Sequence, residues 1–442
     1  MTDTRIAPVE GIATATIQSA IDESHAAGGG RVILASGAVY TSGTLVLRSG
    51  VELHLAHGAV LKGSPDRADY VDATIAGLYG GNAGAFLITA DGAEDVAITG
   101  SGRIDGNADP FFDGWGTDDG PYIRAPKCWR PRGLGLFGCR RVRIQDVSVG
   151  NLAQWTLHLT GCEDVLVQGI TIKNGLDVPN CDGIDPDHCR NVRIIGCHIE
   201  AGDDGIVLKN TREHTRYGPC ENIVVQGCTV VSTSAAIKIG TESSGLFRDV
   251  VIADCVIKAS HRGLAIQLRD DGNVENVLFS NCIVETRLFC PRYWGRAEPI
   301  YVTAWPRHDG DGVGSIRHVR FTNILCRGEH GVFVHGHPDS PVEDIAFTGV
   351  RHELAKTSRW PAGQHDLRPS RGEEHGGLRD DTIAGFHLEH VTGARLTNCA
   401  VAWSGELPEC YGPALQTRNV EDLVVDGFTG EAAHGGEAQV RG

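Results

Sequence analysis

The 442-residue sequence has no surplus of basic residues, because 40 Lys and Arg stand against 56 Asp and Glu and give a net charge of −16. Phosphate groups repel an acidic protein, so we expect neither nucleic acid nor a membrane as a partner. No apolar run approaches the roughly 18 residues that a transmembrane helix needs. The N-terminus also lacks the basic and apolar regions of a signal peptide, which predicts a cytoplasmic protein, or a secreted one if a leader was removed.

Aromatic residues make up only 6% of the chain, and none of its 14 cysteines forms the Cys-x-x-Cys pair that is typical of zinc sites. Glycine is abundant instead, with 58 residues, as expected for a β protein with many tight corners. The cysteines recur at equivalent places in a repeat, so we expect most of them to be buried free thiols. We predict neither a metal nor another cofactor.

A short pattern of alternating apolar residues recurs along most of the chain. The first β-branched residues of six successive copies stand 23 to 31 residues apart, at Val142, Val165, Val192, Ile223, Val250 and Val277. Strand-only repeats of this length are typical of a solenoid whose coils stack on one another. We therefore predict an all-β fold, a right-handed parallel β-helix of about ten coils that forms a single domain over residues 1–442.

Two segments depart from the repeat. Residues 14–30 show an amphipathic pattern that ends at glycines, which predicts a short helix capping the open N-terminal end of the solenoid. Residues 355–381 are polar and rich in Gly, Arg and His, and we expect them to form a long surface loop inserted between two coils.

The segment 180–210 repeats itself. An Asp-Gly-Ile triplet that begins at Asp182 returns at Asp204, 22 residues later, and Asp203 precedes the second copy. On adjacent parallel strands, which lie about 5 Å apart, these three carboxylates would share one patch facing solvent. Crowded carboxylates raise one another's pKa and can leave an acid protonated beside an ionised base, which is the pair that glycosidic-bond hydrolysis needs.

A second strand of each coil lines up on the same pattern. Because side chains alternate along a strand, the residue after each inward apolar position points outward. The candidates for substrate binding on these outward positions are His158, Asp185, Lys209, Lys238, Gln267 and Tyr301. Trp155 is a further candidate, because an indole can stack on a sugar ring. The alternative for each is a solvated or packed residue without a role in binding.

These residues and several longer segments resemble the polygalacturonase family, glycoside hydrolase family 28. The segments are IQSAIDESHAAGGGRVIL, ITGSGRIDGN, QWTLHL, NCDGIDPDHC and GDDGIVLK, and the resemblance covers most of the chain. It implies a right-handed parallel β-helix and an inverting hydrolysis without metal. It also implies that Asp203 is the general acid, that Asp182 and Asp204 activate the attacking water, and that Asn180 contributes to substrate binding.

Two family motifs are replaced. Residues 233–235 read Thr-Ser-Ala in place of Gly-His-Gly, and residues 265–267 read Ala-Ile-Gln in place of Arg-Ile-Lys. The Arg and Lys of the second motif bind the uronate carboxylate in the family, through charge-assisted hydrogen bonds worth roughly 1.5–3 kcal/mol each. We therefore expect a neutral or non-galacturonate sugar at the cleavage subsite, although Lys238 or Arg269 could replace the lost cations.

The sequence thus predicts an inverting glycoside hydrolase that acts in exo fashion on a plant-derived oligosaccharide or glycoside. An exo-galacturonidase or a rhamnogalacturonan-type hydrolase acting on pectin oligosaccharides is an alternative. A β-helix polysaccharide lyase, whose Asp cluster would bind Ca²⁺, is another. A non-catalytic carbohydrate-binding scaffold also stays open, and the sequence predicts no oligomeric state.

Overall fold

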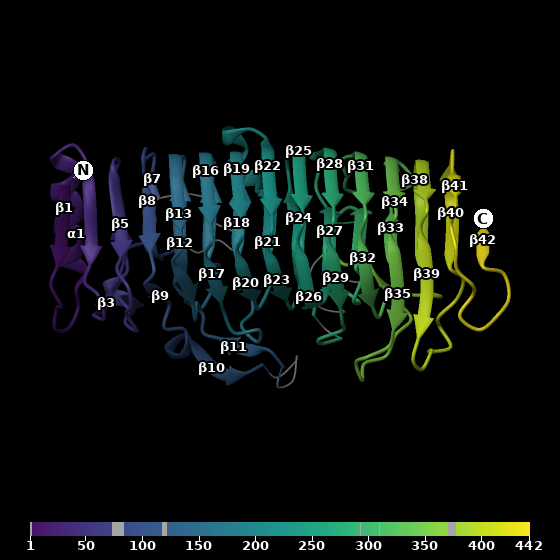
Figure 1. The fold of residues 1–442 in the computed structure, drawn as a ribbon, viewed down its shortest axis with the longest axis horizontal. Coiled ribbons are helices and arrows are strands. Elements are labelled where there is room, and N and C mark those ends of the chain that lie inside the picture. The colour runs from purple at the N-terminus through teal and green to yellow at the C-terminus, as the bar shows by residue number, and fades with distance from the viewer. Residues whose placement is uncertain (1, 73–83, 117–121, 292, 309, 370–376) are drawn as a thin grey trace. The chain divides into compact units, whose positions relative to one another are not determined.

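The computed structural model describes residues 2–72, 84–116, 122–291, 293–308, 310–369 and 377–442. Its elements pack into two compact units, a first unit of residues 1–203 with 213–223 and a second of residues 204–212 with 224–442. Strand β22 (Cys220–Gln226) contains the boundary between the two. Each unit is a right-handed parallel β-helix, as predicted, and its strands form successive rungs (Figure 1). Among the described residues, no helix combines the length and the apolar character needed to cross a membrane.

In the first unit, each strand pairs in parallel with its equivalent one coil away. The first pair is β1 (Thr2–Ile6) with β2. One row contains β2 (Gly30–Leu34), β5 (Val51–Leu55), β8 (Ala97–Gly100), β13 (Arg140–Gln145), β16 (Glu163–Gln168) and β19 (Arg190–Ile195). The second row contains β3 (Val39–Ser42), β6 (Val60–Gly63), β9 (Arg103–Asp105), β14 (Ser148–Gly150), β17 (Thr171–Lys173) and β20 (His198–Ala201). The third contains β4 (Leu45–Val46), β7 (Phe86–Asp91), β12 (Arg132–Phe137), β15 (Leu157–Thr160) and β18 (Ile184–Asp187).

The second unit repeats this arrangement. One row contains β25 (Leu246–Ala253), β28 (Asn273–Ser280), β31 (Ile316–Thr322), β34 (Val342–Thr348), part of β38 (Phe386–Thr397) and β41 (Val424–Asp426). The second contains β23 (Thr229–Ser232), β26 (Val256–Ser260), β29 (Ile283–Thr286), β32 (Leu325–Gly328), β35 (Arg351–Ala355) and β39 (Ala400–Ser404). The third contains β21 (Ile206–Asn210), β24 (Ala235–Ser243), β27 (Arg262–Leu268), β30 (Ile300–Ala304), β33 (Val332–His335), the start of β38, β40 (Leu415–Glu421) and β42 (Gln439–Arg441).

The core of each unit is built from ladders of identical positions. In the first unit, Val142, Val165 and Val192 are register partners and are buried. In the second unit, the rings of Phe279, Phe321 and Phe347 stack with centroids 4.6 and 5.1 Å apart. Such ring pairs contribute about 0.5–1.5 kcal/mol each beyond the burial of their area.

Three repeat cysteines of the first unit form a further ladder. Cys139, Cys162 and Cys189 are buried and carry free thiols in the described structure. The Cys162 thiol donates to the carbonyl of Leu136 and the Cys189 thiol to that of Leu159, at 3.3 and 3.2 Å. For these three residues, the prediction of buried free thiols is confirmed.

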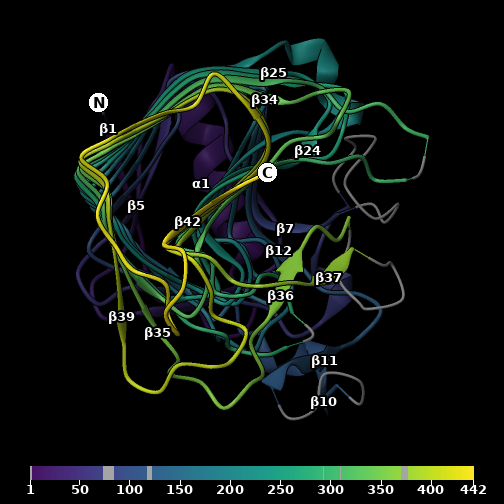
Figure 2. The same cartoon turned by 90° about the vertical axis from the view of Figure 1, so that its right-hand side faces the viewer.

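The α-helix α1 (Thr14–Ala26) lies where the sequence predicts a cap. It buries Ile17 and Ile21 and contacts β1, β2, β4 and β5, and Figure 2 shows it on the inner side of β1 and β5. Burial of each isoleucine contributes roughly 1.5–3 kcal/mol. The helix ends before residue 30 because Gly28 and Gly29 adopt left-handed backbone conformations, with φ of 91° and 111°. A Cβ on Gly29 would lie 2.7 Å from the carbonyl oxygen of Gly50, so the neighbouring coil also demands glycine there.

The segment 355–381 is not the surface loop that its composition predicts. It contains an antiparallel hairpin of β36 (Gln364–Asp366) and β37 (Leu378–Asp380), which Figure 2 shows apart from β34, β35 and β39 of the same unit. Asp366, Leu367 and Arg368 are completely buried. The expectation is wrong for the centre of the segment, because Asp366 and Arg368 pair with each other inside the protein, whereas Arg359, Arg379 and Asp380 are exposed. Residues 370–376 lie outside the described residues.

Other elements lie between the strands of the coils. The first unit carries an antiparallel hairpin of β10 (Phe112–Trp115) and β11 (Arg124–Pro126), and the 3₁₀ helices Arg67–Asp69 and Asp109–Phe111. Another 3₁₀ helix spans Arg212–Tyr217.

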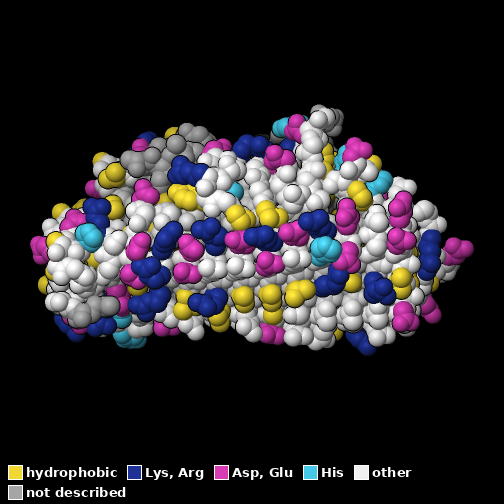
Figure 3. Space-filling model, turned by 90° about the horizontal axis from the view of Figure 1, so that it is seen from above, with side chains coloured by type: hydrophobic (Ala, Val, Ile, Leu, Met, Phe, Trp, Pro, Cys, Tyr) yellow, Lys and Arg dark blue, Asp and Glu magenta, His cyan; other side chains and the backbone are white. Residues whose placement is uncertain are grey.

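Surface charges of both signs are interspersed within each unit. Arg141 pairs with Glu94 and Asp95 in the first unit, and Arg317 pairs with Glu275 in the second. Figure 3 shows basic and acidic side chains next to one another on one face. Exposed pairs of this kind contribute little to stability, so the fold depends on its ladders and buried contacts.

Candidate active site

The outward residues predicted from the sequence are in register within each unit. In the first unit, His158 is the partner of Asp185, and Thr160 that of Asp187. In the second unit, one outward row runs through Val207, Lys238, Ala265, Tyr301 and Phe333. The alignment of the third strand row is therefore confirmed, and no strand is shifted to the opposite face within these rows.

These rows are buried, whereas the sequence predicts that they face solvent. His158, Lys238 and Tyr301 expose 2%, 5% and 0% of their surface. The carboxylates of Asp182, Asp203 and Asp204 are buried as well. The expectation of an open face is wrong because other side chains cover it. In the second unit Leu367 from the 355–381 segment and the half-buried Trp305 pack on this row.

In the first unit, Asp182 and Asp203 lie in the turns that precede or follow short strands. The backbone N–H of Asn180 donates to Oδ2 of Asp203 at 3.2 Å, and the side-chain oxygen of Asn180 accepts from Arg130 at 3.3 Å. Asn180 has a left-handed backbone, with φ of 55°, which asparagine adopts more readily than most residues. Asn180 therefore orients the carboxylate of Asp203 through its backbone, and the contact of this exposed residue with substrate stays a prediction.

Arg132, at the start of β12, is a buried cation that sequence reasoning missed. Its guanidinium lies 4.8 Å from the ring centroid of Trp155. Burial lowers the pKa of Arg132 to about 10, and the charges of Asp185 and Asp182 oppose this shift. The register alone does not mark Arg132, because it stands two residues before Leu134, which is the partner of Leu157 in the inward row.

Trp155 and His158 contact protein groups in the first unit. Their rings meet edge to face with centroids 4.9 Å apart, and Trp155 also meets Arg132. His158 Nε2 lies 3.3 Å from Oδ2 of Asp187. Burial lowers the pKa of His158 to about 4, against the raising effect of Asp187, so the ring is neutral at pH 7. Both residues thus help to organise the strand face, and Trp155 is only 5% exposed.

In the second unit, Asp204 forms a buried ion pair with Lys238. Its other carboxylate oxygen accepts from the backbone N–H of Ala235 at 3.1 Å. Burial alone would raise the pKa of Asp204, but Lys238 and then Lys209 outweigh burial and lower it. Lys209 also lies 3.5 Å from Oε2 of Glu242. Asp204 therefore stays ionised, and Lys238 serves this carboxylate.

Gln267, Arg269 and Tyr301 lie in a buried hydrogen-bond network of the second unit. Arg269 donates to the hydroxyl of Tyr301 at 3.0 Å and to that of Thr303 at 2.9 Å. The side-chain oxygen of Gln267 accepts from Arg262 at 3.0 Å. Burial lowers the pKa of Arg269, mainly against the raising effect of Tyr301. The structure thus brings together three residues that the sequence predicts as substrate contacts, but it covers them with protein.

The part of the chain that the structure describes contains no group of three or more His, Cys, Asp or Glu side chains arranged to hold a metal ion.

Residues 73–287 match the family model of the glycosyl hydrolases family 28. The chain is 32% identical over 250 residues to a probable polygalacturonase of Vitis vinifera. The matched region covers 54% of this chain and 50% of that protein. It is 26% identical over 246 residues to an endo-polygalacturonase of Pectobacterium carotovorum subsp. carotovorum. That matched region covers 53% of this chain and 60% of that protein. The chain thus spans roughly half the length of the curated relatives that it matches.

Two solved structures share the fold. An exopolygalacturonase from Thermotoga maritima matches with a TM-score of 0.67 and 24% identity, over 84% of this chain and 93% of that one. A family 28 exopolygalacturonase of Yersinia enterocolitica matches with a TM-score of 0.70 and 17% identity, over 95% of this chain and 78% of that one. At these identities the likeness is one of fold.

Proposed function

Since this chain is a divergent member of the glycosyl hydrolases family 28, we propose that it hydrolyses glycosidic bonds in a pectin-derived or other plant oligosaccharide or glycoside, with inversion. Asp203 donates a proton to the glycosidic oxygen as that bond breaks. Asp182 and Asp204 take a proton from water, whose oxygen attacks the anomeric carbon from the opposite side. The three residues occupy the positions of the family motifs, and the reaction consumes one water for each bond.

The observation that carries this proposal is the ion pair of Asp204 with Lys238. A general base must be ionised before it can accept a proton, and burial alone would favour the neutral acid. Lys238 overcomes this effect and keeps the Asp204 carboxylate charged inside the protein. An Asp204 that stays ionised supports its role as the base.

We further propose exo-type action. In the second unit Ala235, Ala265, Tyr301 and Phe333 are completely buried and pack together with Leu367. A polymer cannot lie across strands β27, β30 and β33 while protein covers their outer face. This coverage supports an enzyme that takes the end of a chain or a small glycoside.

The sugar at the cleavage subsite is, on this proposal, neutral or at least not galacturonate. Ala265 offers no cation and is covered by apolar side chains. Lys238 pairs with Asp204, and Arg269 is occupied by Tyr301 and Thr303. A uronate carboxylate desolvated beside this row would lose its hydration without gaining a partner.

One observation favours a second candidate, an exo-galacturonidase. Arg132 is a buried guanidinium at the start of β12 in the first unit, with Asp185 and Asp182 close enough to affect its pKa. An arginine there could bind a substrate carboxylate in the bidentate geometry that guanidinium groups favour. The replacement Arg132→Met would then reduce kcat/KM for galacturonides and leave neutral glycosides nearly unaffected.

The proposal is tested with a panel of aryl glycosides and pectin-derived oligosaccharides, with the products followed by proton NMR from the first minutes of reaction. We expect the anomer opposite to that of the substrate to appear first, and kcat/KM to be higher for a neutral sugar than for the matching galacturonide. Retention of configuration would refute the inverting mechanism. An unsaturated product absorbing in the ultraviolet would identify a lyase, and binding without turnover would identify a carbohydrate-binding scaffold.

A further inference from the structure

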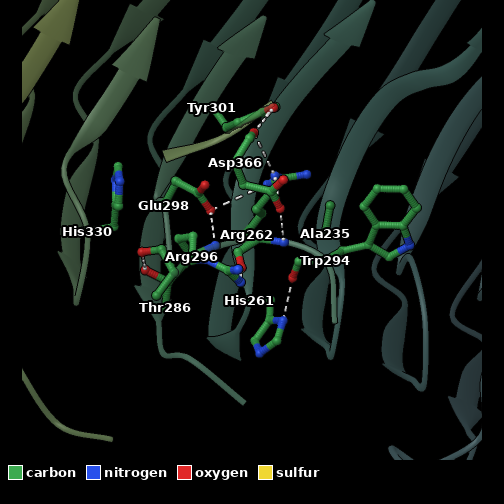
Figure 4. Close-up of polar contacts among 12 residues, drawn as sticks. Ala235, His261, Arg262, Thr286, Trp294, Arg296, Glu298, Tyr301, His330 and Asp366 are labelled. Carbon is green, nitrogen blue, oxygen red and sulfur yellow. Dashed lines mark hydrogen bonds and ion pairs between the residues drawn. The ribbon is translucent and has the colours of Figure 1, made fainter. Parts of the chain in front are cut away.

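A buried cluster of charged residues in the second unit joins Arg262 on β27, Glu298 just before β30 and Asp366 at the end of β36 (Figure 4). Nη2 of Arg262 is 3.0 Å from Oδ2 of Asp366, and Nε of Arg262 is 3.4 Å from Oε2 of Glu298. The three side chains are almost completely buried. We assign proton transfer to neither of the two carboxylates, Glu298 and Asp366.

The Arg262 side chain extends along the outer face of its own strand. Its Nη1 donates to the side-chain oxygen of Gln267, five residues further on, at 3.0 Å. Its Cζ lies 3.8 Å from the ring centroid of Tyr301, which is the register partner of Ala265. The guanidinium therefore lies beside Ala265, on the row where the sequence lacks the arginine of the Arg-Ile-Lys motif. Arg262 reaches this place from three residues upstream.

Asp366 already occupies this guanidinium. Its carboxylate also accepts from Nε and Nη2 of Arg368, both at 2.9 Å, and from the backbone N–H of Gly295 at 2.9 Å. The hydroxyl of Tyr301 donates to the backbone carbonyl of Asp366 at 2.6 Å and holds the hairpin in place. Burial would raise the pKa of Asp366, but Arg368 and Arg262 outweigh burial and keep this pKa far below its usual range. The Asp366 carboxylate is thus ionised at pH 7.

We propose that Asp366 is a specificity-determining residue: it is an internal carboxylate that occupies Arg262 and so keeps this guanidinium from binding a substrate uronate. The inference rests on the proposed function, because it assumes that the outward row adjoins the bound sugar. It gives a reason for the pairing of an apolar residue at position 265 with a buried arginine beside it. It also gives the inserted hairpin a role, since the hairpin delivers the competing carboxylate.

The test compares the wild-type protein with Asp366→Asn, which removes the charge at nearly constant shape, and Asp366→Glu, which retains the charge. Titration calorimetry measures the affinities for free galacturonic acid and free galactose. We expect the ratio of acid to neutral affinity to rise about tenfold in Asp366→Asn, because a nearby positive charge is no longer compensated. Asp366→Glu is expected to keep the wild-type ratio. An unchanged ratio in a folded Asp366→Asn protein would overturn the inference.

A matched control is Asp381→Asn in the same segment, because Asp381 pairs with Arg418 rather than Arg262. It should leave the affinity ratio unchanged, and a shift as large as that of Asp366→Asn would overturn the inference by revealing a loosened hairpin. If Asp366→Asn does not fold, Glu298→Gln removes the other carboxylate from Arg262 and is expected to raise the ratio in the same direction. An unchanged ratio there would also overturn the inference.

These binding measurements need no turnover. A shifted affinity ratio in a protein that hydrolyses none of the glycosides would refute the proposed hydrolysis and leave the role of Asp366 standing. Hydrolysis of a neutral glycoside with an unshifted ratio would refute the role of Asp366 alone.

Discussion

Replacing Lys238 with Met tests whether the buried ion pair controls the charge of the candidate base. Methionine keeps an unbranched side chain of similar length but removes the ammonium group that contacts Asp204. Both side chains are buried, with 6% and 4% of their surface exposed. Removing one partner of a buried ion pair typically costs about 3–5 kcal/mol, because the other charge remains buried without compensation. We expect Lys238→Met to lower the free energy of unfolding by about 3 kcal/mol at pH 7.

The loss should depend on pH in a defined direction. In the wild-type protein Lys238 and Lys209 lower the pKa of Asp204 against the effect of burial. The stability that Asp204 contributes is therefore complete above its unfolded pKa of about 3.9 and is lost as the pH falls through the lower folded value. Without Lys238, burial is expected to raise the folded pKa above the unfolded one. The contribution of Asp204 is then complete only below about pH 4 and is lost as the pH rises through the folded pKa.

Urea unfolding of both proteins from pH 3 to pH 8 measures this difference, and the pH profile of kcat/KM reports the same group in the active enzyme. The gap in stability should be largest near pH 7 and should shrink toward pH 4, while the acidic limb of kcat/KM moves to higher pH. Lys209→Met is the matched control and should show a smaller gap, because Lys209 has the weaker effect on Asp204. A second substitution, Asp204→Asn, should recover part of the stability lost in Lys238→Met. A gap that is constant over the whole pH range would refute the reasoning.

Three further outcomes are expected. Asp203→Asn should reduce kcat about 10²–10⁴-fold with an unchanged circular dichroism spectrum. The control Asp146→Asn, at an exposed corner, should leave kcat unaltered. Near-normal turnover by Asp203→Asn would show that another group is the acid. A chelator should not change the rate of hydrolysis. A loss of activity in the presence of the chelator would favour the lyase. Phe321→Ala, between the stacked rings of Phe279 and Phe347, should lower the free energy of unfolding by about 3–5 kcal/mol in urea, and a loss below about 1 kcal/mol would mean that these rings contribute little.

The stacking of coils and its register follow from the sequence alone. Apolar alternation has a period of two residues, and its return at each coil places equivalent residues on top of one another. Val142 and Val165 are therefore partners, as are Lys238 and Ala265. The capping helix also follows from a local signal, because consecutive glycines end an amphipathic pattern. These features need only residues that are close in sequence or one repeat apart.

The burial of the outward rows and the pairing of their charges depend on tertiary structure. A pattern of alternation tells which side of a strand a residue occupies, but not which other segment covers that side. Asp366 contacts Arg262, which lies 104 residues earlier in the sequence. Leu367 covers residues of β24, β27, β30 and β33, and all four strands precede it in the sequence. The polar composition of residues 355–381 predicts an exposed segment. It cannot distinguish charges that face water from charges that pair with buried ions of the opposite sign.

The same limit applies to the candidate catalytic carboxylates. Their presence follows from the repeated Asp-Gly-Ile triplet, which is a local feature of the chain. The charge that Asp204 carries depends on Lys238, one coil further along, and on burial that no pattern of residue types specifies. Local periodicity thus determines where the side chains stand, because it is encoded in neighbouring residues. Tertiary packing decides their surroundings and their charge, because desolvation and ion pairing depend on segments that are distant in sequence.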